Sequence, residues 1–128
     1  MSRIISISLN DELLERVDEV QRELGFSGRS EVIRAGIRML IADSKEREKL
    51  TGTLNSVLML VHTKSVEDTV TRMKHEHEGV INAHLHCHLR GDKCLEILVL
   101  NGDAPKIKQL VDAFHSSGKM GYVKLIVL

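Results

Sequence analysis

Apolar and polar side chains alternate along the first residues of the chain. Over residues 3–9, one side of an extended backbone would carry Ile5, Ile7 and Leu9, and the other side would carry Ile4, Ser6 and Ser8. A period of two is typical of a strand, because successive side chains of a strand point to opposite faces. Residues 3–9 therefore predict a half-buried strand.

Two helical patterns follow this strand. Asn10 is a favourable N-cap for a helix that opens with acidic residues, and Gly25 is a natural stop, so one helix is expected between them. A second helix is expected to start near residues 27–30 and to bury an apolar face made of Val32, Ile33, Gly36, Ile37, Leu40 and Ile41. It ends in the charged stretch 43–49, which we interpret as a solvated helix end or linker.

The remaining residues predict the order strand, helix, strand, strand, helix, strand. Helices are expected to open near Ser65 and Asp103, and the strands are expected over residues 53–61, 80–89, 94–100 and 122–128. This is the ferredoxin-like βαββαβ order, which places both helices on one face of an antiparallel sheet. The predicted fold class is therefore α+β, with one domain over residues 1–46, a linker over 47–52 and a second domain over 53–128.

The first domain cannot complete a sheet alone, because a single strand leaves both of its edges unpaired. Pairing with the same strand of a second chain resolves this. A strand–helix–helix unit that dimerises through its strand is the ribbon-helix-helix architecture of small repressors, which lay the ribbon into the major groove of DNA. A dimerisation module without a DNA role is the alternative.

The composition favours self-association. The chain has 128 residues, of which 42% are hydrophobic and only 2% aromatic, so the core must be aliphatic. Domains of half this length bury little surface alone, and oligomerisation is a usual remedy. The 18 basic and 18 acidic side chains cancel, so a nucleic-acid role has to rest on a motif and not on charge.

Three features of the sequence bear on the cellular compartment in which the protein is expected. No apolar stretch is long enough for a membrane span, and the first residues lack the layout of a signal peptide. The two cysteines then indicate reduced thiols, which are available as metal ligands. A cytoplasmic location is expected.

The stretch from His84 to Leu89 carries the candidate chemistry. On a strand, His86 and His88 share a face with His84, and the next strand places Cys94 and Glu96 on that face. The opposite face collects the side chains Ile81, Ala83, Leu85, Cys87, Leu89, Leu95, Ile97 and Val99. We expect this apolar face to pack on the helices, and the imidazoles, the thiol and the carboxylate to lie on the face away from them.

The hairpin loop tests this register. A two-residue turn would pair Leu89 with Cys94, whereas a three-residue loop over residues 90–92 places His88 opposite Cys94. Cys87 and Cys94 fall on opposite faces, so a disulfide between them is disfavoured.

Imidazoles and a thiolate on adjacent strands favour a late first-row ion such as Ni(II), Cu(II) or Zn(II) over Mg(II) or Ca(II). His86, His88 and Cys94 are the candidate ligands, while exposure or packing is a sufficient explanation for His84 and Cys87.

A fourth ligand is needed to complete such a site. His75 and His77 end a helix that we expect on the other face of the sheet, so either one would have to come from a neighbouring subunit. Leu98 and Leu100, on the face that bears the ligands, would then also find their partner there.

Two motifs together resemble the nickel-responsive repressor family, NikR, over essentially the whole chain. They are Arg29-Ser30-Glu31-Val32-Ile33-Arg34 at the start of the second helix and the spacing His86-x-His88-x5-Cys94-Leu95-Glu96. The resemblance implies an ACT-like domain after the ribbon-helix-helix domain and a dimer of dimers. It also implies Ni(2+) bound between regulatory domains of different subunits, in a square-planar site of three imidazole nitrogens and one thiolate sulfur.

The resemblance also implies roles for single residues. His86, His88 and Cys94 match the ligands from one subunit, and His75 matches the ligand from the other. Glu96 matches a position where a carboxylate can orient an imidazole. The candidate DNA contacts are Arg3, Ile4, Ser6, Ser8, Arg29 and Ser30, with Ser30 at a helix N-terminus that meets phosphate.

Two positions depart from the family pattern. Members commonly carry arginine on the groove-facing side of the strand, where Ile4 stands here, and Arg3 lies one residue early on the other side. Arginine is the best reader of guanine, so base recognition is expected to weaken unless Arg3 turns toward the groove. Ala35 stands where the family often has an acidic residue, which argues against an accessory cation site between the domains.

The sequence therefore predicts a nickel-responsive repressor that binds double-stranded operator DNA as a homotetramer. One alternative is the same architecture sensing copper, cobalt or zinc, and another is an ACT-type sensor of a small molecule, against which the histidine-rich face argues. An enzyme is not expected, because no activated nucleophile or acid–base pair is evident and a fully ligated metal lacks the open position that catalysis requires.

Overall fold

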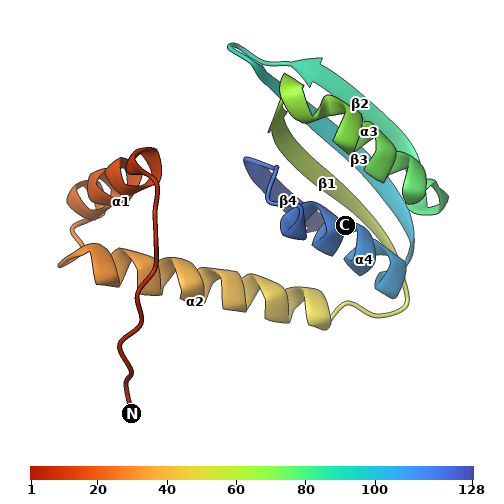
Figure 1. Ribbon diagram of the computed structural model, residues 1–128. Helices are drawn as coiled ribbons and strands as arrows, with labels where there is room; N and C mark the ends of the chain where they lie inside the picture. Colours follow the sequence, from red (N-terminus) through yellow and green to blue (C-terminus); the bar gives the residue numbers. More distant parts are fainter. The chain divides into compact units, whose positions relative to one another are not determined.

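The computed structural model describes all 128 residues, and the chain divides into two compact units, Met1–Glu48 and Lys49–Leu128 (Figure 1). The first unit contains helices α1 (Asp11–Leu24) and α2 (Arg29–Glu48). The side chain of Asn10 accepts a hydrogen bond of 2.8 Å from the backbone N–H of Leu13, as a helix N-cap does. Gly25 ends α1 with a φ of 74°, a left-handed conformation that glycine adopts without strain.

Residues 1–10 form no strand in the single chain, contrary to the expectation for residues 3–9. The physical reason is that the backbone groups of a ribbon strand find their partners in a second chain. Ile4 and Ile5 are 100% and 79% exposed, and no residue of α1 or α2 is buried. The apolar side chains left exposed on the two helices include Leu13, Val20, Leu24, Ile37, Leu40 and Ile41.

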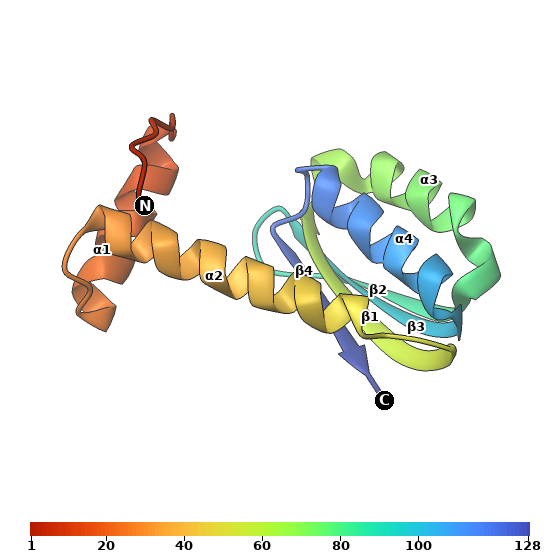
Figure 2. The same cartoon turned by 90° about the horizontal axis from the view of Figure 1, so that it is seen from below.

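The second unit contains four antiparallel strands in the order β2-β3-β1-β4. The strands are β1 (Thr53–Thr63), β2 (Ile81–His88), β3 (Lys93–Asp103) and β4 (Tyr122–Val127). Helices α3 (Glu67–Glu76) and α4 (Ala104–Ser116) lie on one face of the sheet (Figure 2). This confirms the predicted α+β class and the βαββαβ order.

Short 3-10 turns, Lys64–Val66 and Glu78–Val80, flank α3. The sequence predicts that Ser65 caps α3, but Ser65 lies within the first of these turns and Val66 precedes the helix. The Ser65 hydroxyl instead forms a hydrogen bond of 2.7 Å with the hydroxyl of Thr63.

The core lies between the two helices and the covered face of the sheet. Strand residues that point toward the helices are Leu58, Leu60, Leu98 and Leu100, and the helices contribute Val70, Met73, Ile107, Leu110, Val111 and Phe114. Cys94 and Glu96 have the same parity on β3 as Leu98, and they are 0% and 1% exposed. The candidate ligand face is therefore the face under the helices.

This corrects the assignment of the two faces made from the sequence. Leu98 and Leu100 are covered by helices of their own chain, while Leu85 and Leu89, expected under the helices, are 54% and 39% exposed. A bulge between Ile81 and Ala83 also separates these two residues, so that only Ile81 packs against the core. The assignment failed because both faces of β3 are apolar, and alternation alone does not identify the inner one.

None of the helices is both long enough and apolar enough to cross a membrane.

Candidate metal centre

The hairpin between β2 and β3 has the register that the candidate site requires. His88 pairs with Cys94 and His86 pairs with Glu96. The backbone N–H of Leu89 donates to the carbonyl of Lys93 at 2.9 Å, which leaves residues 90–92 as the loop. Gly91 in this loop has a φ of 77°, where glycine is favoured. The expected three-residue loop is confirmed.

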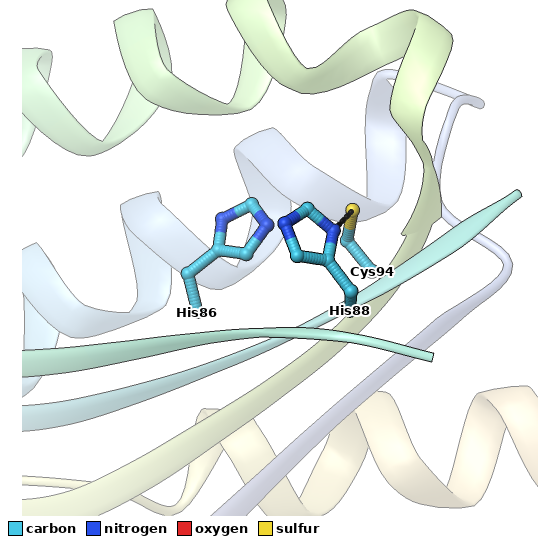
Figure 3. A group of neighbouring side chains, drawn as sticks. All are labelled: His86, His88 and Cys94. Atoms are coloured by element: carbon cyan, nitrogen blue, oxygen red, sulfur yellow. Dashed lines mark hydrogen bonds between the residues drawn. The ribbon is translucent and has the colours of Figure 1, made fainter. Parts of the chain in front are cut away.

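His86, His88 and Cys94 form one cluster on the face under the helices (Figure 3). One ligand atom from each lies within 4.8 Å of the others, and the sulfur of Cys94 is 3.8 Å from Nδ1 of His88. Cys94 is buried, His86 is partly buried, and His88 is exposed. The cluster therefore reaches from the core to the surface at the loop end of the hairpin.

Glu96 holds the imidazole of His86 in one orientation. Nδ1 of His86 lies 2.8 Å from a carboxylate oxygen of Glu96. Because the carboxylate accepts, this nitrogen carries the ring proton and donates a hydrogen bond to Glu96. The ammonium of Lys74 on α3 donates to both oxygens of Glu96, at 3.2 and 3.1 Å. Nε2 of His86 is buried and has no hydrogen-bond partner. Glu96 thus leaves this nitrogen free to bind a metal.

His62 lies on β1 directly beside Cys94 and is 2% exposed. Nδ1 of its ring is 2.8 Å from the carbonyl of Thr63, to which it donates a hydrogen bond. Nε2 then faces Glu96 at 3.6 Å without a hydrogen bond. Buried polar nitrogens without a hydrogen-bond partner are rare in proteins. Two of them, Nε2 of His62 and Nε2 of His86, lie at this cluster.

Glu67, the first residue of α3, lies on the other side of His86. One of its carboxylate oxygens is 3.4 Å from Nε2 of His86. Burial raises the pKa of the Cys94 thiol, and the negative charge of Glu67 raises it further. The thiol therefore keeps its proton at neutral pH, and a metal ion that binds the sulfur must displace it.

The other candidate side chains lie apart from the cluster. His75 is 80% exposed and lies 3.4 Å from a carboxylate oxygen of Glu78. It lines a surface hollow together with His84. Cys87 is a free thiol on the uncovered face, paired with Leu95 across the strands, and Cys94 is also free, so the disfavoured disulfide is not formed.

The donor set fits a late transition metal. One soft sulfur and two imidazole nitrogens converge, and one of the nitrogens is buried and unpartnered. Ions such as Ni(II), Cu(II), Co(II) and Zn(II) favour these donors, whereas Mg(II) and Ca(II) favour oxygen. A further ligand is still needed for a four-coordinate site.

The candidate DNA contacts divide into two groups. Arg3, Ile4, Ser6 and Ser8 lie in the exposed first ten residues, and Ser30 is exposed at the start of α2. Arg29 is already engaged: its Nε and Nη2 donate to the two carboxylate oxygens of Asp18 on α1, at 2.8 and 3.0 Å. This ion pair lowers the pKa of Asp18 through the hydrogen bond and charge of Arg29. Arg29 therefore joins the two helices, while its side chain stays 57% exposed.

Sequence reasoning missed three residues around the cluster: His62 and Glu67, which lie beside His86, and Lys74, which bonds to Glu96. The parity of β1 could have identified His62, because it shares a face with Leu58 and Leu60. Glu67 and Lys74 could not be placed, because the helix that carries them was assigned to the opposite face. Glu67 and Lys74 are seven residues apart, about two helical turns, so on the correct face both side chains lie over the hairpin, beside His86 and Glu96.

Both units match known families. Residues 52–128 match the NikR C terminal nickel binding domain, and residues 3–44 match ribbon-helix-helix proteins of the copG family. Proteins of Methanococcus maripaludis and Methanocaldococcus jannaschii that carry a nickel-responsive regulator name are 36% identical over 127 residues, which cover 97% of this chain and 90% of theirs. A Halobacterium salinarum protein with the same name is 34% identical over 117 residues, covering 89% of this chain and 82% of its own length.

A solved structure shares the fold at lower identity. An uncharacterised protein of Thermotoga maritima superimposes with a TM-score of 0.55 and 19% identity, over 60% of this chain and 99% of that chain. At this identity the likeness concerns the fold alone. The two domain matches together span both units, and the 36% identical relatives align over nearly the whole chain. On these grounds, the chain belongs to the NikR family.

Proposed function

We propose that this chain is a nickel-responsive transcriptional repressor in which a metal shared between subunits controls binding to double-stranded operator DNA. The observation that carries the proposal is the convergence of His86, His88 and Cys94 on the hairpin. The family relationship supports a regulator and not an enzyme. When Ni(II) is bound, it supplies a link between ligands from different subunits.

The fourth ligand is assigned to His75 of a second subunit. Within its own chain, His75 lies eight residues along α3 from Glu67, the residue beside His86. At 1.5 Å per residue this is roughly 12 Å along the helix axis. The imidazole of His75 is also 80% exposed, so it is available to another subunit.

The homotetramer is assigned from the two exposed apolar surfaces. The first unit exposes the isoleucines that a two-chain ribbon would bury, and this accounts for one pair of subunits. The uncovered face of the sheet exposes Leu85, Leu89, Val99, Tyr122 and Ile126. Apolar patches of this kind are usually interfaces, and burying this one against a second copy makes a dimer of dimers.

Metal binding would then act on DNA through the assembly. A ligand that binds one assembled arrangement better than others stabilises that arrangement by its difference in affinity. A metal held by His86, His88 and Cys94 on the helix-covered side of one subunit and by His75 of another would be a separate contact from the one through the uncovered face, and it would fix how the regulatory units meet. That contact sets the spacing of the two ribbons, which read half-sites on the operator.

In this assembly the ribbon residues Arg3, Ile4, Ser6 and Ser8 are assigned to the major groove. Ser30 and the free amides at the start of α2 are assigned to a backbone phosphate. The domain limits of 1–46, 47–52 and 53–128 and a cytoplasmic location belong to the same proposal.

The donor set by itself also suits a sensor of copper, cobalt or zinc, and this remains the second candidate. The two candidates separate on which ion tightens DNA binding. A response to Zn(II) equal to that to Ni(II) would favour the second.

Subunit complementation tests the shared site. His75→Ala and Cys94→Ala proteins are prepared separately and then refolded together. Each variant refolded alone under the same conditions is the control. Mixed oligomers contain sites with His86, His88 and Cys94 from one chain and His75 from the other. We expect neither parent to give the wild-type nickel charge-transfer absorption and the mixture to regain it. A mixture that equals the average of its parents would contradict the shared site.

A further inference from the structure

Glu67 is placed to take part in the metal centre, although nothing in the ligand motif includes it. Its carboxylate oxygen is 3.4 Å from Nε2 of His86, the nitrogen that Glu96 leaves free. Its side chain is 44% exposed, so it has room to turn toward an ion at the mouth of the site. Glu67 itself is not within the 4.8 Å cluster, and binding an ion there requires that turn.

Two carboxylates lie beside the imidazole of His86: Glu67 at Nε2, 3.4 Å away, and Glu96 at Nδ1, 2.8 Å away. Glu96, the other nearby carboxylate, is already bonded to the Lys74 ammonium. Glu67 is therefore the carboxylate whose charge is available to an incoming cation.

The charges and donors in one chain then suffice for a closed site. A Cys94 thiolate and the Glu67 carboxylate balance the two positive charges of a divalent ion, with the thiol proton released to solvent. Zn(II) takes sulfur, imidazole nitrogen and carboxylate oxygen in tetrahedral sites. Nickel in the square-planar form that the family resemblance implies takes a third imidazole nitrogen as its fourth ligand instead.

We propose that Glu67 supplies a fourth ligand from the same chain, so that Zn(II) or Co(II) is held within one subunit while Ni(II) recruits His75 of another subunit. The inference rests on the proposed function, because it gives Glu67 a role in metal discrimination at that site. An ion closed by Glu67 makes no link between subunits. Zn(II) would then bind to the protein without raising its affinity for DNA.

The test uses the full-length chain and Zn(II) and Ni(II) salts as probes. Affinities are measured by competition with a chelator for the wild type, Glu67→Gln and Glu76→Gln. Glu76 is the matched control because it has the same charge on the same helix and pairs with Arg72 at 3.6 Å. We expect Glu67→Gln to weaken Zn(II) binding on the order of 10-fold or more, since loss of even an outer partner costs that much. Ni(II) affinity should change by less than roughly 3-fold, within the reach of surface electrostatics alone.

Visible absorption of Co(II) reports the ligand directly. In a His75→Ala background the site should still give the intense bands of a four-coordinate Co(II) centre, and adding Glu67→Gln should abolish them. Unchanged bands and Zn(II) affinity after Glu67→Gln would overturn the inference. An equal loss in Glu76→Gln would also overturn it, because charge alone would then be the cause.

These outcomes are separable from failure of the proposed function. Nickel binding that requires His75, together with Zn(II) binding that ignores Glu67, removes only the role of Glu67. A wild-type protein that binds neither ion contradicts both proposals.

Discussion

The two faces of the four-stranded sheet are both rich in apolar side chains, yet they end in different environments. Under the helices, Leu58, Leu60 and Leu98 are 0% exposed, whereas Leu85 and Val99 on the other face are 54% and 41% exposed. The covered face also holds the buried polar group made of His62, Cys94 and Glu96. One face is completed by the chain itself, and the other is the face that we propose a second copy covers.

The difference bears on why a charged cluster is kept in the core. Burying a carboxylate is costly unless it is paired, and Glu96 is paired with Lys74 and His86. Replacing such a group with apolar residues of similar volume is often neutral or stabilising, so stability alone does not account for it. The contribution that we propose is orientation, because Glu96 fixes the imidazole of His86 before a metal would bind.

The largest effect on the free energy of unfolding is expected from shortening a side chain on the covered face, with the neighbouring residue on the uncovered face as its control. Leu98→Ala removes a fully buried side chain and should lower the free energy of unfolding by about 2–5 kcal/mol. Val99→Ala, one residue along and 41% exposed, should cost far less within a subunit. Urea unfolding at matched protein concentrations measures both. Equal losses would show that the faces are not distinct.

The proposed interface on the uncovered face can be disrupted without touching the core. Leu85→Lys should weaken self-association of the regulatory unit, because about 1.5–3 kcal/mol is lost for each large apolar side chain that is not buried. That corresponds to a dissociation constant raised roughly 10- to 150-fold. Sedimentation velocity gives the oligomeric state and circular dichroism checks that the fold is kept. A tetramer unchanged at low micromolar concentration would refute the assignment of this face.

On the covered face, Glu96→Gln should weaken nickel binding by about 10- to 100-fold, because the amide orients His86 less firmly and leaves Lys74 without its charge partner. Glu76→Gln serves as the comparison, since Glu76 is 57% exposed and pairs with Arg72 at 3.6 Å. Chelator competition measures both affinities. A Glu96→Gln protein with wild-type nickel affinity would show that His86 is oriented by something else.

The smallest effect is expected away from the sheet, at the ion pair between Asp18 and Arg29. Arg29→Ala should weaken DNA binding only by roughly a few-fold, because exposed ion pairs contribute little. The exchanged pair, Asp18→Arg with Arg29→Asp, should restore affinity if Arg29 positions the helices. If Arg29 instead contacts phosphate, the exchanged pair will bind no better than Arg29→Ala. Fluorescence anisotropy with labelled duplex DNA decides between these results.

This ion pair also predicts a pH dependence. Arg29 lowers the pKa of Asp18, so the pair is intact at and above the ordinary titration range of aspartate. Its contribution to stability should be fully present above that range and lost progressively as the pH falls through it toward the lowered pKa of Asp18. The difference in stability between wild type and Asp18→Asn should therefore be constant near neutral pH and shrink in acid.

The sequence was sufficient for features that local chemistry decides. The cap at Asn10, the stop at Gly25 and the loop over residues 90–92 all depend on neighbours in the chain, and all were predicted. So was the parity that brings His86, His88 and Cys94 together. The choice of the inner face was wrong, because Leu98 and Val99 are both apolar and only the packing of the helices separates them. His62, Glu67 and Lys74 were missed because they come from other elements and meet His86 or Glu96 only in the folded chain.

The two cysteines allow the most direct test of the central claim, since they lie on opposite faces of the same hairpin. Affinity for a DNA duplex, selected from a random pool by the nickel-loaded wild type, is measured with and without Ni(II) for wild type, Cys94→Ala and Cys87→Ala. We expect nickel to tighten DNA binding in wild type and Cys87→Ala, and Cys94→Ala to lose the response. DNA affinity that is the same with and without nickel in the wild type, or a full response in Cys94→Ala, would contradict it.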